Sequence, residues 1–161
     1  MKTIVFMRHA KAEVIKLEKS DFERKLTDKG KNDAQNAAKS LLKDIHKIDL
    51  IITSSAKRTF KTAKIVAEVF DIDKKEILCF DELYEAEHNE YLKVIRSIDD
   101  TNINTVLVVG HNPTIFAIAD AMSSFLFDDF KPGAYVVFNI PIETFKMFVL
   151  GPANLLHSYT P

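Results

Sequence analysis

The sequence is poor in the residues that mark several classes of protein. Its 161 residues include one cysteine, four glycines and no tryptophan. The single Cys79 excludes an internal disulfide framework and favours a reducing compartment, so we expect a cytoplasmic protein with Cys79 as a small buried hydrophobe. Walker-type glycine spacing is absent, and no arginine follows Cys79 at the spacing of a cysteine-dependent phosphatase. Any phosphate would therefore have to be held by other side chains.

Long hydrophobic runs and an excess of one charge are absent as well. The apolar run Thr3–Met7 is too short for a signal-peptide core or a membrane span, and Arg8 interrupts it. The 22 Lys and Arg residues nearly balance the 23 Asp and Glu residues, which leaves a net charge of −1. We therefore expect no membrane and no nucleic acid partner, and we take a monomer as the default state.

No repeat, low-complexity stretch or Gly/Ser linker divides the chain, which predicts a single domain over residues 1–161. A chain of this length with 47% hydrophobic residues can build a core without disulfide or metal cross-links. We expect no second domain and no separate lid.

Apolar, β-branched runs alternate with amphipathic segments, the pattern of an α/β fold. Strands are expected at Thr3–Met7, Leu50–Thr53, Ile77–Phe80, Thr105–Val109, Ala134–Ile140 and Thr144–Leu150. Helices are expected at Lys29–Lys43, Ala56–Phe70, His88–Ile98 and Thr114–Phe125. The pattern predicts a three-layer αβα sandwich with a mainly parallel sheet. The last two strands are separated by the short turn Pro141–Glu143, so we expect a hairpin that adds an antiparallel edge.

Ligands of such sheets bind beyond the carboxyl ends of the strands, so the residues that follow each strand are the candidates for a site. Arg8 and His9 directly follow the first strand. The second strand leads into "TSSAKRTFKTA", where Ser54 or Ser55 is expected to cap a helix and Arg58 falls in its first turn. Arg58 should therefore lie near the strand ends.

The strand Thr105–Val109 leads into "GHNPT". Gly110 is suited to a tight exit from the strand, Asn112 to a helix cap and Pro113 to the first helical position. This pattern places His111 at a helix start. The N-terminus of a helix favours anions because its N–H groups are unpaired and the helix dipole is positive there.

Two guanidinium and two imidazole groups form a poor metal site, since arginine has no lone pair to donate, but a good phosphate site. Guanidinium groups bind phosphoryl oxygens in a bidentate manner, and phosphoryl transfer needs mainly positioning and charge neutralisation. We therefore expect no metal and no cofactor. His9 is the predicted nucleophile, which would form a transient phosphohistidine that water hydrolyses, with His111 as a charged or hydrogen-bonding clamp on the phosphoryl oxygens.

Several motifs together resemble the histidine phosphatase superfamily, the phosphoglycerate mutase-like proteins, and within it the compact phosphohistidine phosphatase branch of the Six type. In chain order these motifs are "MRHAKAE", "DFERKLTDKG", "SSAKRTFKTA", "ELYEA", "VVGHNP", "KPGAYVVF" and "HSYTP". The sequence departs from the commoner "RHG" form at Ala10, and it lacks the long insertion that forms a lid in larger relatives. The resemblance implies an open, shallow pocket.

The resemblance also implies a set of roles. His9 would be the phosphorylated nucleophile, and Arg8, Arg58 and His111 would bind the phosphate. Glu82 would be the acid that protonates the leaving group, with Glu85, Glu87 and His88 as alternatives and an ordinary surface carboxylate as the competing interpretation of Glu82. Arg24 and Asn112 would lie at the rim.

Three functions remain open from the sequence. The favoured one is a metal-independent hydrolase that removes phosphate from phosphohistidine on a signalling or carrier protein. The second is a phosphatase of small phosphate esters, which would share the pocket but need the acid more. The third is a module that binds phosphorylated ligands without turnover.

Overall fold

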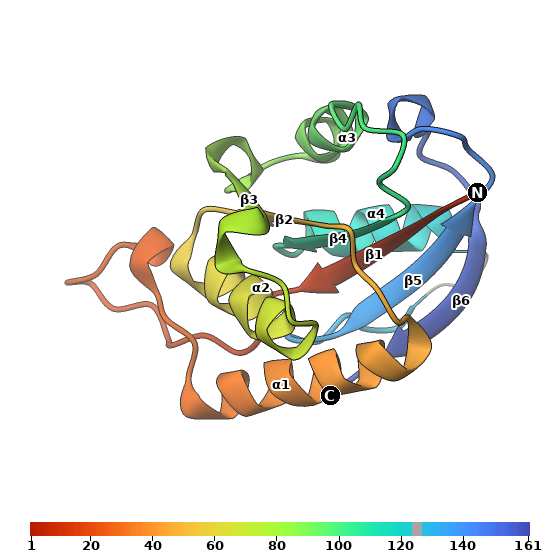
Figure 1. Ribbon diagram of the computed structural model, residues 1–161. Helices are drawn as coiled ribbons and strands as arrows, with labels where there is room; N and C mark the ends of the chain where they lie inside the picture. Colours follow the sequence, from red (N-terminus) through yellow and green to blue (C-terminus); the bar gives the residue numbers. More distant parts are fainter. Residues whose placement is uncertain (124–126) are drawn as a thin grey trace.

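In the computed structural model, which describes residues 1–123 and 127–161, a six-stranded sheet lies between two layers of helices (Figure 1). The strands are β1 (Lys2–Arg8), β2 (Leu50–Ser54), β3 (Ile77–Phe80), β4 (Thr105–Gly110), β5 (Tyr135–Ile140) and β6 (Asn154–Tyr159). Their order across the sheet is β3-β2-β4-β1-β5-β6. The first four strands are parallel, while β5 is antiparallel to both β1 and β6. The predicted α/β class with an antiparallel edge is confirmed.

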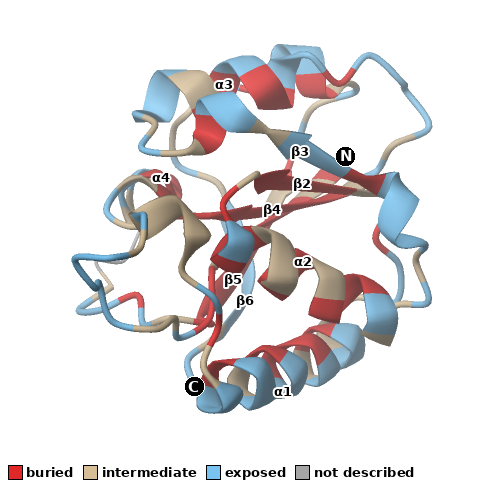
Figure 2. Ribbon diagram, turned by 90° about the vertical axis from the view of Figure 1, so that its left-hand side faces the viewer, coloured by how far each residue is buried: buried red, intermediate tan, exposed pale blue. Residues whose placement is uncertain are grey.

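The helices are α1 (Asp28–Asp44), α2 (Lys57–Val69), α3 (His88–Arg96) and α4 (Thr114–Met122). Alternate residues of the central strands supply the two faces of the core. Val5 and Met7 pack with α1 and α2, whereas Ile4 and Phe6 pack with α3 and α4. Figure 2 shows α1 and α2 on one side of the sheet and α3 on the other. No helix within the described ranges has both the length and the apolar character needed to cross a membrane.

The start of α1 fixes the segment that follows β1. Thr27 caps the helix by accepting a hydrogen bond from the Gly30 N–H at 2.9 Å. A Cβ atom at Gly30 would lie 2.0 Å from the Lys11 carbonyl oxygen, so only glycine allows the two backbones to approach this closely. Ala12 and Leu26 then form an antiparallel bridge beside this contact. The segment between β1 and α1 is thus held at both ends.

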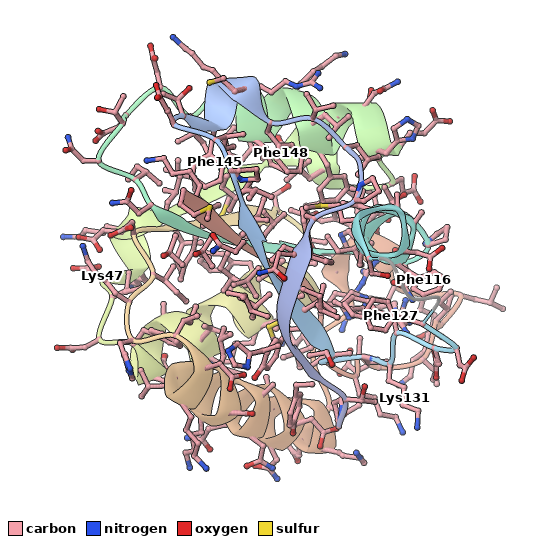
Figure 3. All side chains as sticks on the ribbon, turned by 90° about the vertical axis from the view of Figure 1, so that its right-hand side faces the viewer. Lys47, Phe116, Phe127, Lys131, Phe145 and Phe148 are labelled. Atoms are coloured by element: carbon pink, nitrogen blue, oxygen red, sulfur yellow. The ribbon has the colours of Figure 1, made fainter. Side chains whose placement is uncertain are left out.

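The predicted strand Thr144–Leu150 and its hairpin are wrong. This segment contains a single 3-10 turn, Phe145–Met147, and the strand that pairs with the outer edge of β5 is β6. Phe145 and Phe148 are three residues apart, and both are buried in the same core cluster as the apolar side chains of α3. Figure 3 shows the two rings next to that helix. Arg96 of α3 also donates a hydrogen bond to the Phe148 carbonyl at 2.7 Å. Helix packing therefore overrides the apolar pattern of a strand.

Two further expectations differ from the structure at the ends of elements. Cys79 is exposed rather than buried, because β3 is an edge strand of the sheet. The helix expected to reach Phe125 ends at Met122 among the described residues, and Phe125 itself lies outside them.

Candidate active site

The two histidines of the site follow neighbouring parallel strands. Arg8, the last residue of β1, is paired with Gly110, the last residue of β4. His9 and His111 therefore leave the sheet side by side, and the His9 N–H donates to the Gly110 carbonyl at 3.1 Å. Their ring centroids lie 5.4 Å apart. Both side chains are buried.

A cavity of about 480 Å³ opens at these strand ends. Its lining residues are Arg8, His9, Ile15, Asp21, Arg24, Arg58, Tyr84, Glu85, His111 and Asn112. The four residues that the sequence placed around a phosphate, together with the two expected at the rim, all line it. Arg58 comes from the first turn of α2, as expected, although Ala56 rather than a serine occupies the cap position.

His9 is held as a neutral imidazole. Its Nδ1 lies 2.7 Å from the Ala10 carbonyl oxygen, which can only accept, so Nδ1 carries the proton and Nε2 keeps its lone pair. Burial, together with the nearby His111, Arg58 and Arg8, lowers the pKa of His9 to about 3 despite this hydrogen bond. The structure records no protein hydrogen bond to Nε2 within the described residues. An uncharged imidazole with a free Nε2 can act as a nucleophile.

His111 is positioned by its neighbours in β2 and α3. Its Nε2 lies 2.9 Å from the hydroxyl of Ser54, and its backbone N–H donates to the Tyr91 hydroxyl at 3.3 Å. Burial and the charge of Arg58 lower the pKa of His111 to about 4. His111 is therefore neutral at physiological pH when no ligand is bound. Of the two forms expected for this residue, a charged clamp or a hydrogen-bonding clamp, the free site has the hydrogen-bonding one.

Asn112 lies beside Arg8 instead of capping a helix. Asn112 Nδ2 and Arg8 Nη1 both donate to the Phe130 carbonyl, at 3.2 and 3.0 Å. The helix α4 begins at Thr114, and Pro113, which follows a cis peptide bond, occupies the cap position. The expected cap at Asn112 and the first helical position for Pro113 are thus wrong, while both residues remain next to the site.

Asp21 links the three other polar side chains of one wall of the cavity. Its carboxylate accepts hydrogen bonds from Arg24 Nη1 at 2.6 Å, Arg58 Nη2 at 2.9 Å and the Tyr84 hydroxyl at 2.8 Å. Partial burial would raise the pKa of Asp21, but these hydrogen bonds and the charge of Arg58 hold it well below its usual range. Asp21 therefore stays ionised and keeps the two arginines in place.

The polar groups of the cavity are incompletely paired. Among the described residues, five buried side-chain atoms lack a hydrogen-bond partner, and four of them belong to cavity residues: Arg8 Nε, Arg58 Nε, His111 Nδ1 and Asn112 Oδ1. Buried polar groups are nearly always paired in a protein at rest, so such a concentration indicates a site whose partner is a ligand. Two of these atoms are guanidinium donors, which suit an anion.

Glu82 lies outside this cavity. It is exposed and lines a separate cavity of about 300 Å³ with Glu90 and Lys93. Glu85 lines the cavity of His9 and His111 instead, because the chain turns there with a positive φ of 52° after the 3-10 turn Asp81–Leu83. Glu87 and His88 begin α3 and are exposed. The geometry therefore moves the candidate acid from Glu82 to Glu85.

Sequence reasoning gave no role to Asp21, Tyr84 or Ile15, which the structure adds to the cavity. The one available signal was the spacing of Asp21 and Arg24, since an acid and a base three residues apart can pair within one turn. No group of three His, Cys, Asp or Glu side chains suited to a metal ion occurs in the described parts of the chain. The donors that meet here are those of an anion site.

A family model described as the histidine phosphatase superfamily (branch 1) matches residues 4–93, more than half of the chain. A comparison with curated proteins gave no match.

Solved structures match over nearly the whole chain. A putative phosphohistidine phosphatase SixA from Agrobacterium tumefaciens is 28% identical, with a TM-score of 0.82 over 99% of this chain and 98% of the other. A putative phosphohistidine phosphatase SixA from Nakamurella multipartitia is 26% identical, with a TM-score of 0.85 over 99% and 96%. The protein histidine phosphatase SixA complexed with tungstate is 17% identical and shares the fold, with a TM-score of 0.78 over 97% and 95%.

Proposed function

Because the chain belongs to branch 1 of the histidine phosphatase superfamily, we propose that it removes phosphoryl groups from phosphohistidine side chains of proteins through a phosphorylated His9. The single observation that carries the mechanism is the state of His9, which is neutral, protonated on Nδ1 and free at Nε2. The two similar structures described as putative phosphohistidine phosphatases support the choice of substrate.

In the first step, His9 Nε2 attacks phosphorus while the bond from phosphorus to the substrate imidazole breaks. The substrate imidazole leaves and takes up a proton. In the second step, water attacks the phosphorylated His9, the new P–N bond breaks, and inorganic phosphate and free His9 are released. Both steps need the attacking and leaving atoms in line and the charge on the phosphoryl oxygens neutralised.

Arg8 and Arg58 supply that neutralisation in this proposal, and His111 contributes a hydrogen bond. Their unpaired buried atoms support these roles, since a phosphoryl group would give them partners. The negative charge of a bound phosphoryl group also favours the charged form of His111, so the clamp would become cationic only when substrate is present. Arg24 and Asn112, which also line the cavity, would contact groups next to the phosphoryl oxygens.

Glu85 is the proposed acid, because it is the carboxylate on the 82–88 segment that lines the cavity. An alkoxide leaving group requires a proton far more than an imidazole does, so Glu85 matters most for phosphate esters. We also propose that residues 1–161 act as a single domain in the cytoplasm.

The test is the release of inorganic phosphate from a histidine-phosphorylated protein and from an alkyl phosphate, without added metal, by the wild type and His9→Ala. We expect the wild type to prefer the phosphoprotein and His9→Ala to lose both activities. Label from radioactive phosphoprotein should also appear on the wild type and not on His9→Ala.

Unchanged turnover in His9→Ala would contradict the mechanism. A preference for the alkyl phosphate would instead make the protein a phosphatase of small esters. Binding of inorganic phosphate without turnover of either substrate would make it a binding module.

A further inference from the structure

The loop that follows the bridge at Ala12 exposes aliphatic side chains beside the phosphate cavity. Val14, Ile15 and Leu17 are 74, 71 and 109% exposed, and they make up three of the nine large hydrophobic residues exposed in the described chain. Figure 1 shows this segment, between β1 and α1, projecting beyond the body of the protein. Apolar side chains gathered on one exposed segment mark interaction surfaces more often than scattered ones do.

We propose that this loop, residues 14–19, and a lysine-lined groove that begins at Glu13 at its base form the docking surface for the phosphorylated protein, and that this partner presents an apolar patch flanked by carboxylates. The proposal rests on the proposed function and specifies the partner of the same site.

The loop has a defined conformation, because several hydrogen bonds fix its base. The Glu13 N–H donates to the Lys25 carbonyl at 2.9 Å, and Arg24 Nε donates to the Glu13 carbonyl at 2.6 Å. Lys19 Nζ pairs with the Glu13 carboxylate at 2.7 Å, and the Lys19 N–H donates to the Lys16 carbonyl at 3.1 Å. The aliphatic side chains are thus held in water by an ordered turn, which lowers the entropy lost when a partner covers them.

The loop is continuous with the phosphate cavity, which identifies the kind of occupant. Ile15 lines that cavity together with Arg24, while Val14 and Leu17 do not. A small ester can fill the cavity of about 480 Å³ without reaching Val14 or Leu17. A protein whose phosphohistidine reaches His9 has surface around that residue, and this surface covers the loop.

The groove has a volume of about 610 Å³, and Leu26 of the Ala12–Leu26 bridge is one of its lining residues. It is lined by Glu13, Lys25, Leu26, Thr27, Asp28, Lys31, Lys57, Phe60 and Lys61. Two of its lysines are chain neighbours of residues that line the phosphate cavity: Lys25 follows Arg24, and Lys57 precedes Arg58.

The charge of this groove favours carboxylates. Lys31 pairs with Asp28 and Lys57 pairs with Glu23, whereas no ion pair is recorded for Lys25 or Lys61 within the described residues. Four lysines against two acids leave the lining positive. A positive patch beside an apolar one steers and orients a partner with the complementary pattern.

The experiment compares two substrates that share the same P–N bond, a histidine-phosphorylated phosphotransfer protein and phosphoimidazole. The variants are Val14→Ser/Leu17→Ser for the loop and Lys25→Glu/Lys61→Glu for the groove. The matched controls are Leu42→Ser/Val149→Ser, which are exposed aliphatic residues elsewhere, and Lys39→Glu/Lys43→Glu on the exposed side of α1.

We expect each test variant to lower kcat/KM for the phosphoprotein by about tenfold and to leave kcat/KM for phosphoimidazole unchanged, which corresponds to about 1.4 kcal/mol of lost docking. The effect of the lysine variant should shrink at high salt, because charge steering is screened. The controls should leave both substrates unaffected.

Wild-type turnover of both substrates with no selective loss in the variants would overturn the docking surface and leave the proposed function intact. Wild-type turnover of phosphoimidazole alone would overturn the proposed function together with the docking surface. A concentration-dependent dimer in sedimentation that Val14→Ser/Leu17→Ser abolishes would show that a second copy covers the loop, which also overturns the proposal.

Discussion

Asp21 holds both terminal nitrogens of the Arg58 guanidinium. Arg58 Nη2 donates to the Asp21 carboxylate at 2.9 Å, and Nη1 donates to the Asp21 carbonyl oxygen at 2.7 Å. The side chain of Arg58 is 7% exposed and that of Asp21 is 31% exposed, so the pair is partly shielded from water. Because Nη1 and Nη2 are both hydrogen-bonded, the planar guanidinium group cannot rotate, and its remaining N–H groups point in a fixed direction. The position of Arg58 therefore depends on Asp21.

Replacing Asp21 should impair catalysis through Arg58. We expect Asp21→Ala to lower kcat/KM for phosphoimidazole by about 10²-fold, because a displaced phosphate-binding group loses its alignment with the reacting bond. Glu23→Ala removes an acid from the same 3-10 turn whose recorded ion pair is with Lys57, and it should change little. Steady-state kinetics of the two variants make the comparison. Equal losses in both would assign the effect to the turn and not to the contact with Arg58.

The buried histidines should make the free energy of unfolding depend on pH. His9 and His111 have folded pKa values of about 3 and about 4, and both are ordinary histidines once the chain unfolds. Below the unfolded pKa of about 6.5, the unfolded chain takes up protons that the folded chain does not, so stability falls as the pH falls. Between pH 7.5 and pH 5 each histidine should lower the free energy of unfolding by about 2 kcal/mol.

Urea denaturation at the two pH values, in a buffer without phosphate, measures this difference. His9→Asn should reduce this difference in the free energy of unfolding by the contribution of one histidine. A pH dependence that persists in full in His9→Asn would show that His9 is not held neutral.

The helices and the central strands could be predicted because the spacing of apolar residues and the order of the elements along the chain determine them. The edge of the sheet could not. The segment of β6, NLLHSY, shows no alternation of apolar and polar residues and is largely exposed, so it lacks the signal of a strand. The apolar residues Phe145 and Phe148 instead led to a strand being predicted at residues 144–150. Their spacing fits a turn packed on α3 as well as it fits a strand. The choice between them depends on tertiary contacts.

In the site too, some residues could be predicted from the sequence and others could not. His9 and His111 could be placed from the sequence because parallel strands bring their carboxyl ends together, and Arg58 because it begins the next helix. Asp21 and Tyr84 come from irregular segments that are positioned by side-chain contacts with Arg58, and no periodic pattern encodes those contacts.

The choice between Glu85 and Glu82 can be decided by their effects on different leaving groups. We expect Glu85→Gln to lower kcat for an alkyl phosphate by about 10²- to 10⁴-fold, the usual contribution of a general acid, and to affect phosphoimidazole much less. Glu82→Gln, which alters a carboxylate outside the cavity, should leave both rates unchanged. The measurement is kcat for each substrate. Equal losses on both substrates in Glu85→Gln would indicate a role in binding and exclude one in leaving-group protonation.

Gly110 couples the stability of the fold to the position of His111. A Cβ atom there would lie 2.4 Å from the Tyr91 hydroxyl, whose oxygen accepts the His111 N–H. Gly110→Ala should therefore lower the free energy of unfolding by about 1–3 kcal/mol, as overpacking of a buried site does, and should lower kcat/KM as well. Gly151→Ala is the control, because nothing lies within 4 Å of its new Cβ.

The double variant Gly110→Ala/Tyr91→Phe distinguishes this clash from a general intolerance of alanine in β4. Removing the Tyr91 hydroxyl takes away the closest atom, although ring carbons remain 2.9 and 3.0 Å from the added Cβ. The two substitutions should thus be less harmful together than the sum of their separate effects, since residues in contact are not additive. Urea denaturation of all four proteins in the cycle measures the coupling. Strict additivity would mean that the cost of alanine arises in the strand itself, and the position of His111 would then not depend on the contact between Gly110 and Tyr91.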